Sequence, residues 1–170
     1  MPDPAMMSRT TGRRPLKAIK VEAGRDRDDN ALQIVDWRFE CKVSGRDTNG
    51  DYCIFDTIRS GRGGPPLHVH HDQDEWFYVR DGEFVFVVGN EMFHLKPGDS
   101  LLGPRGVPHT FAGTTDASAL LIMFQPAGGI EQLFLKACHT SQLRPLTLDD
   151  WRLFGRAYGV DIVGPPLTVD

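Results

Sequence analysis

Short apolar runs separated by turn-forming residues fill the middle of this 170-residue sequence. The runs "FVFVV" (84–88), "EMFHL" (91–95) and "ALLIMF" (119–124) are divided by Gly-Asn, Pro-Gly-Asp and Thr-Thr-Asp. Many short strands with regularly spaced turns are typical of an antiparallel sandwich or barrel. Runs that are apolar on both faces indicate strands covered by a second sheet on one side and by another layer or a subunit on the other. We therefore expect an all-β fold over residues 21–127.

The C-terminal part has a helical rather than a strand-like periodicity. The segments "GIEQLFLKACH" from residue 129 and "TLDDWRLFGRAYG" from residue 147 each space apolar residues along one helical face. Thr147 is a plausible N-cap and Gly159 a plausible C-cap of the second helix. We expect three segments: a flexible basic arm over 1–20, a β-domain over 21–127, and a C-terminal helical extension over 128–170 packed on that domain.

Composition excludes several classes of protein. The three cysteines, Cys41, Cys53 and Cys138, form no C-x-x-C pair, so neither a disulfide framework nor a thiolate metal site is indicated, and a cytoplasmic location is favoured. No segment has the length of a membrane span or the apolar core of a signal peptide. Net charge is −4, and five basic residues gather in the N-terminal arm: Arg9, Arg13, Arg14, Lys17 and Lys20. Because no basic or aromatic stripe elsewhere supports binding, we expect a solvated tail and no nucleic-acid partner, with a nucleic-acid contact of the arm as the alternative; with no membrane span we expect no membrane partner.

A cluster of potential metal ligands lies in "PPLHVHHDQDEWFYV", residues 65–79. If residues 71–74 form a hairpin loop, His70 and Glu75 face each other, and His68 points to the same side because strand side chains alternate. Two imidazoles and a carboxylate suit a divalent first-row metal. The alternative is a group of surface histidines beside a polar turn.

A second segment, "PGDSLLGPRGVPHTFAG" (97–113), contains His109. Together the two segments resemble the two motifs of the cupin superfamily. His68, His70, Glu75 and Gly82 fit the first motif in type and spacing, and a second set fits the other motif: Gly98, Pro104, Gly106 and His109. The sequence departs from the motifs at two turn positions, where Arg62 replaces a glycine and Gly113 replaces an asparagine.

The resemblance implies a cupin jelly-roll-like antiparallel β-barrel with a short C-terminal helical extension. It also implies one metal per chain, bound by His68, His70, Glu75 and His109. Four such ligands leave an octahedral ion two open positions, which favours Fe, Mn, Ni or Co, although Zn could be present in protein as purified. The alternative is a cupin that has kept these residues and works without metal.

The segments look most like small single-domain cupins grouped with quercetin 2,3-dioxygenases. This similarity implies a metal-dependent dioxygenase that cleaves a flavonol-like or other enolic small molecule with O2. Glu75 would then be catalytic, as the acceptor of the substrate's proton. Phe77 and Phe111 share strand parity with Glu75 and His109, so we expect them to line the substrate pocket, unless they belong to the core.

Other functions are open for the same fold, because one scaffold hosts many chemistries. They are a non-catalytic metal or small-molecule binding or sensor cupin, and a metal-dependent decarboxylase or isomerase. Small acids would need a basic anchor such as Arg59 or Arg105, whose directions strand parity does not decide. Outward-facing Trp76 and Tyr78 predict a homodimer.

Overall fold

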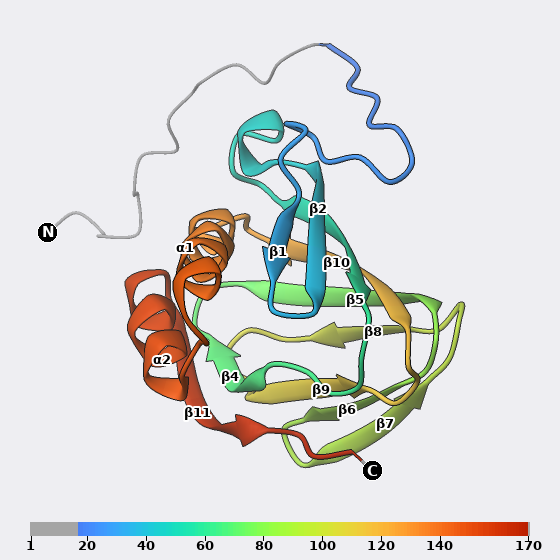
Figure 1. The fold of residues 1–170 in the computed structure, drawn as a ribbon, viewed down its shortest axis with the longest axis vertical. Coiled ribbons are helices and arrows are strands. Elements are labelled where there is room, and N and C mark those ends of the chain that lie inside the picture. The colour runs from blue at the N-terminus through green and yellow to red at the C-terminus, as the bar shows by residue number, and fades with distance from the viewer. Residues whose placement is uncertain (1–16, 170) are drawn as a thin grey trace, which may run out of the picture.

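The computed structural model describes residues 17–169, and most of the basic arm expected over 1–20 lies outside them. The described strands form two antiparallel sheets (Figure 1). The first sheet has the order β1 (Leu32–Ile34), β2 (Trp37–Val43), β3 (Cys53–Arg59), β10 (Ser118–Gln125), β5 (Asp74–Asp81) and β8 (Ser100–Gly103). The second has the order β11 (Val160–Pro166), β4 (Pro66–His70), β9 (His109–Gly113), β6 (Phe84–Val88) and β7 (Glu91–Leu95).

The inner faces of the two sheets meet in an aromatic core. The ring of Phe77 on β5 lies 4.8 Å from that of Phe86 on β6 and 5.2 Å from that of Phe111 on β9, between centroids. These rings are at most 2% exposed. The all-β, jelly-roll-like expectation is thus confirmed, with one correction: the described strands make two facing sheets and not a closed barrel.

Strand β5 shows how alternation positions side chains. Glu75, Phe77 and Val79 are buried between the sheets, while Trp76 and Tyr78 are only partly buried on the opposite face. Because successive side chains of a strand point to opposite faces, the polar Glu75 shares the inner face with apolar neighbours. The alternation predicted for this strand is confirmed.

The hairpin expected around residues 71–74 is wrong. Strand β4 pairs with β9 and β11, whereas β5 pairs with β8 and β10 in the other sheet. The connection therefore crosses from one sheet to the other. Gln73 anchors it by donating to the backbone oxygens of Pro126 and Ala127, at 2.7 and 2.8 Å.

Two helices follow the strands, as the periodicity predicts. Helix α1 (Ile130–Leu143) packs against β1, and α2 (Leu148–Ala157) packs against α1 and β11 (Figure 1). Thr147 is the N-cap of α2: its side chain accepts from the Asp150 backbone at 3.2 Å, and Asp150 accepts from the Thr147 backbone at 2.9 Å. This reciprocal capping box satisfies two amides that the helix leaves free.

The chain continues beyond α2 into a strand that the sequence did not predict. Gly159 has a φ of +77°, which ends the helix and redirects the chain. Strand β11 then pairs with β4, with Val160 opposite His70 and Ile162 opposite His68. The C-terminal segment is thus more than a helical extension, because its last strand extends the sheet beside β4.

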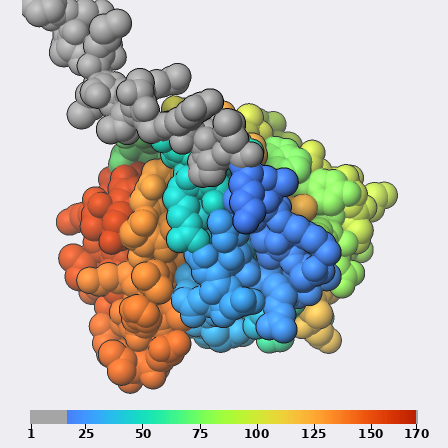
Figure 2. Space-filling model, turned by 90° about the horizontal axis from the view of Figure 1, so that it is seen from above, coloured from blue at the N-terminus to red at the C-terminus, as the bar shows by residue number. Residues whose placement is uncertain are grey.

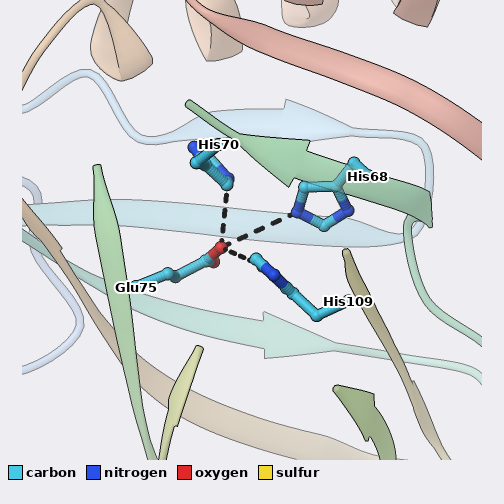
Figure 3. A group of neighbouring side chains, drawn as sticks. All are labelled: His68, His70, Glu75 and His109. Atoms are coloured by element: carbon cyan, nitrogen blue, oxygen red, sulfur yellow. Dashed lines mark hydrogen bonds and ion pairs between the residues drawn. The ribbon is translucent and has the colours of Figure 1, made fainter. Parts of the chain in front are cut away.

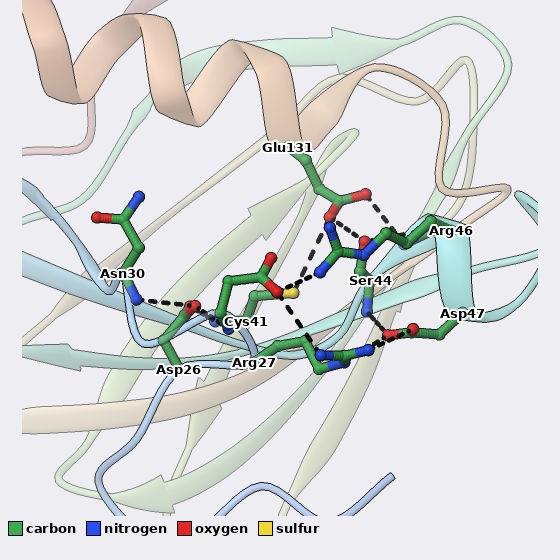
Figure 4. A network of polar contacts seen from close by, with 10 residues as sticks. Asp26, Arg27, Asn30, Cys41, Ser44, Arg46, Asp47 and Glu131 are labelled. Carbon is green, nitrogen blue, oxygen red and sulfur yellow. Dashed lines mark hydrogen bonds and ion pairs between the residues drawn. The ribbon is translucent and has the colours of Figure 1, made fainter. Parts of the chain in front are cut away.

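A polar network holds α1 against the segment that follows β2 (Figure 4). Glu131, in the first turn of α1, accepts hydrogen bonds from Ser44 Oγ at 2.7 Å and from the Gly45 amide at 3.0 Å. Arg27 forms two 3.1 Å hydrogen bonds with Asp47 in the adjoining short helix η1 (Gly45–Asp47). In a space-filling view, the surfaces of the N-terminal strands and of α1 lie side by side (Figure 2).

No helix within residues 17–169 has the length and apolar character needed to cross a membrane.

Candidate metal centre

The four residues singled out by their motifs meet between the two sheets (Figure 3). His68 and His70 come from β4, and His109 begins the neighbouring β9, where it is paired directly with His68. Glu75 reaches them from β5 in the facing sheet. One sheet therefore supplies the three histidines, and the facing sheet supplies the carboxylate.

The three histidine side chains converge on one carboxylate oxygen of Glu75. Glu75 Oε2 lies 2.9 Å from His109 Nε2, 3.2 Å from His70 Nε2 and 3.7 Å from His68 Nε2. Potential ligand atoms of the cluster all lie within 4.8 Å of one another, and every member is buried. Three nitrogens and one oxygen thus surround a single small volume.

Backbone carbonyls determine which ring nitrogens face this volume. Nδ1 of His68 is 2.7 Å from the carbonyl oxygen of Pro66, and Nδ1 of His109 is 3.0 Å from that of Val107. A carbonyl oxygen only accepts, so each Nδ1 carries the proton, and in a neutral ring Nε2 then presents its lone pair. Lone pairs aimed at the Glu75 carboxylate repel it unless a cation, either a proton or a metal ion, lies between them. The donor set therefore fits a bound divalent metal.

Two members of the cluster, Glu75 and His68, have pKa values shifted toward the forms that bind a metal. Burial raises the pKa of Glu75, but its polar contacts with His109, His68 and His70 outweigh burial and hold that pKa well below its usual range. Burial also lowers the pKa of His68, which favours the neutral imidazole that binds metals. In His109 burial is outweighed by the hydrogen bond to Glu75, so its pKa is raised. Nδ1 of His70 is buried and has no hydrogen-bond partner among the described residues.

A cavity of about 380 Å³ opens from the cluster. His68, His70 and Glu75 form its polar end. Its remaining surface is mostly apolar and contains six aromatic side chains: Trp37, Phe39, Phe111, Phe124, Phe134 and Trp151. The volume and lining are typical of a site for a small organic molecule.

The two phenylalanines expected to line the pocket occupy different places. Phe111 is among the lining residues of the cavity. Phe77 is not, and it has no exposed surface. Its ring packs on Phe111 and lies 6.2 Å from the His109 ring, which places it in the core beneath the cluster.

The two arginines considered as anchors for a small acid, Arg59 and Arg105, lie in different environments. Arg59 lines the cavity, whereas Arg105 is exposed and paired with Asp74 at 2.7 Å.

Several cavity residues were missed by sequence reasoning. Trp37 comes from β2, Phe134 from α1 and Trp151 from α2. The apolar faces of both helices were visible in the sequence, but nothing local connected those faces to the histidines.

Sequence comparisons agree with this geometry. Residues 54–124 match the family model described as "Cupin domain". The chain is 30% identical over 93 residues to quercetin 2,3-dioxygenase from Bacillus subtilis, covering 54% of this chain and 27% of that protein. It is 40% identical over 55 residues to oxidoreductase iacF from Pestalotiopsis fici, covering 32% of this chain and 27% of that one. The chain thus spans about a quarter of the length of these relatives.

Solved structures show the same fold at low identity. KdgF from Halomonas sp. superposes with a TM-score of 0.50 at 20% identity, covering 58% of this chain and 88% of that one. Oxalate decarboxylase from Bacillus subtilis gives a TM-score of 0.51 at 17% identity, covering 58% of this chain and 27% of that one. The motifs and the facing sheets agree with the family match, and together they identify residues 54–124 of this chain as a cupin domain.

Proposed function

We propose that this protein is a metal-dependent dioxygenase that cleaves a flavonol-like or other enolic small molecule with O2. One observation carries the proposal: three histidine nitrogens and a carboxylate oxygen converge at the polar end of an aromatic-lined cavity. The partial similarity to quercetin 2,3-dioxygenase supports this reaction class. Fold alone would leave the chemistry open.

His68, His70, Glu75 and His109 would hold one divalent ion, for which we propose Fe, Mn, Ni or Co. When bound, such an ion supplies Lewis acidity that lowers the pKa of an enol or phenol oxygen on the substrate. A tetrahedral zinc would be saturated by the same four ligands, so zinc in purified protein would not identify the productive metal.

The chain's own residues supply positioning and proton transfer. Aromatic side chains such as Trp37 and Phe134 would hold a planar substrate and exclude water from the polar end. Glu75 is the carboxylate at that end, with a lowered pKa that keeps it ionised, so it can accept the enol proton. The reaction needs this proton removed because the enolate is the electron-rich form that O2 attacks.

Glu75→Gln tests this proposal. The amide keeps the shape of the side chain and cannot act as a base, so oxygen uptake with quercetin should fall by about 100-fold or more. Uptake is measured with an oxygen electrode after metal reconstitution, and metal content is measured on the same samples. Asp72→Asn is the matched control, because Asp72 is an exposed acid in the adjoining loop.

A Glu75→Gln protein that keeps both its metal and full turnover would contradict the proposed role of Glu75. Ligand binding without oxygen uptake by the unaltered, reconstituted protein would instead support a non-catalytic binding cupin.

We also propose a homodimer that covers the outer face of β5. Trp76 and Tyr78 stack there with ring centroids 6.1 Å apart, and Trp76 is paired across the sheet with Leu102, which is 53% exposed. Contiguous apolar surface of this kind marks protein interfaces. A monomeric mass by light scattering would contradict the dimer.

A further inference from the structure

Arg59 is a charged residue in the lining of a largely apolar cavity. It ends β3, and only 13% of its side chain is exposed. Its guanidinium carbon lies 5.1 Å from the centroid of the Trp37 ring, in the geometry of a cation–π contact. A charge so far removed from water needs polar partners.

Asp36 is a polar partner for only one of the N–H groups of Arg59. The Nε of Arg59 donates to Asp36 Oδ2 at 3.1 Å, and this is the only hydrogen bond from the guanidinium to the described residues. Asp36 lies in the turn between β1 and β2, and its side chain is 32% exposed. The planar fork of an arginine carries further N–H donors, which are left for another acceptor.

A glycine-rich loop makes room for this pair. A Cβ at Gly61 would lie 2.7 Å from Asp36 Oδ2, and one at Gly63 would lie 3.3 Å from Arg59 Nη2. Gly63 also has a φ of +106°, which disfavours any side chain there. The loop is therefore shaped around the Arg59–Asp36 pair.

Ring contacts connect Arg59 with the metal-ligand cluster. Trp37, beneath the guanidinium, lies 5.5 Å from Phe111 between ring centroids. Phe111 follows His109 by two residues on β9, so both point to the inner face. An aromatic molecule lying along these rings would have one end at the cluster and the other near Arg59.

We propose that Arg59 binds an anionic oxygen, a carboxylate or a phenolate, on the molecule that occupies the cavity, in competition with Asp36. This inference rests on the proposed function for its substrate site and deepens it by naming the substrate class. That class is an aromatic compound with an enol or phenol oxygen at the cluster and an acidic oxygen at the opposite end.

The test compares two probes of the same shape, 2-naphthoate and the neutral 2-naphthamide, by calorimetry. Chelator-treated protein is used, so that a carboxylate bound to metal does not contribute. The unaltered protein should bind 2-naphthoate about tenfold or more tightly than 2-naphthamide, because charge-assisted bonds to arginine are strong. Arg59→Met should abolish this preference, while Arg152→Met, on the exposed side of α2, should leave it unchanged.

Asp36→Asn should change the affinity for 2-naphthoate in the opposite direction from Arg59→Met. Removing the competing carboxylate should raise the affinity for 2-naphthoate by about twofold or more, because the guanidinium then no longer exchanges an ion pair with Asp36 for one with the ligand. If the pair only holds the turn in place, Asp36→Asn and Arg59→Met would weaken both probes alike, and this result would overturn the proposal. So would equal affinity of the unaltered protein for the two probes.

Failure of the dioxygenase proposal would look different. In that case the preference for 2-naphthoate and its loss in Arg59→Met would persist, while reconstituted protein would consume no oxygen with quercetin.

Discussion

The polar end of the cavity comes from one part of the chain, whereas much of its apolar wall comes from segments on either side of that part. The ligand cluster lies on β4, β5 and β9, all within the matched residues 54–124. Trp37, Phe134 and Trp151, which shape the walls, all lie outside that range. The matched domain therefore supplies the candidate chemistry and part of the wall, including Phe111 and Arg59, and the flanking segments supply the rest of the wall.

The two regions also differ in burial. The cluster sits on a core of fully buried rings such as Phe77 and Phe86, whereas Trp37 and Trp151 are only partly buried. Changes beneath the cluster should therefore affect folding strongly, and changes in the walls should affect mainly ligand binding.

The largest effect is expected for Phe77→Ala. Removing this ring leaves a void under the cluster and should lower the free energy of unfolding by about 3–5 kcal/mol, measured by urea denaturation. Met92→Ala on β7 is the control: Met92 is 61% exposed, and its loss should cost no more than about 0.5 kcal/mol. Equal costs for the two variants would contradict the difference in burial.

Trp151→Ala should separate ligand binding from metal binding. Loss of this wall should weaken 2-naphthamide binding by about tenfold, equivalent to about 1.4 kcal/mol, by calorimetry. Metal content should not change. Leu153→Ala, 67% exposed on the same helix, should bind the probe normally. If Trp151→Ala lost metal as well, the two regions would not be independent.

Thr147→Ala tests how much the N-cap of α2, the helix that carries Trp151, stabilises the protein. Losing the N-cap of α2 should cost about 1 kcal/mol in the free energy of unfolding, measured by urea denaturation. Thr147→Ser keeps the capping hydroxyl and should stay within a few tenths of a kcal/mol of the unaltered protein. A Thr147→Ser protein as unstable as Thr147→Ala would show that the methyl group, and not the cap, matters.

The smallest expected effect is a pH dependence of the stability that Asp150 contributes at the start of α2. Hydrogen bonds from Arg144, and then from Thr147, hold the pKa of Asp150 below its usual range. A carboxyl whose pKa is lowered by folding stabilises the protein above its unfolded pKa of about 3.9 and loses that contribution as pH falls further. The stability difference between unaltered protein and Asp150→Asn should thus be constant above about pH 5 and narrow below pH 4. If this stability difference became larger below pH 4, the direction proposed for the pKa shift of Asp150 would be wrong.

Local alternation was enough to predict three of the four cluster members but not the way they meet, and His109 is identified only by the resemblance to the second cupin motif. His68, His70 and Glu75 were chosen because they share strand parity, and they do converge. The hairpin offered as the reason was wrong, since β4 and β5 belong to facing sheets. The face to which a side chain points is set within its own strand. Which strand pairs with which depends on contacts between residues far apart in the chain.

Other features depended on such distant contacts as well. The sequence of strand β11, "VDIVGPP", carries prolines that disfavour a strand, yet pairing with β4 and packing on α2 support it at the sheet edge. Trp151 was correctly placed on a helical face. Its position against the cavity follows from how α2 docks, which no local pattern encodes.

Metal binding by His68, His70, Glu75 and His109 can be tested by elemental analysis of protein purified without chelator or affinity metal and then reconstituted with Fe, Mn, Ni or Co. We expect about one ion per chain for the unaltered protein. We expect the same for His71→Ala, an exposed histidine paired with Asp161, and near-complete loss of metal for His109→Ala. Far less than one ion per chain in every reconstituted form, or unchanged metal in His109→Ala, would contradict metal binding by these residues.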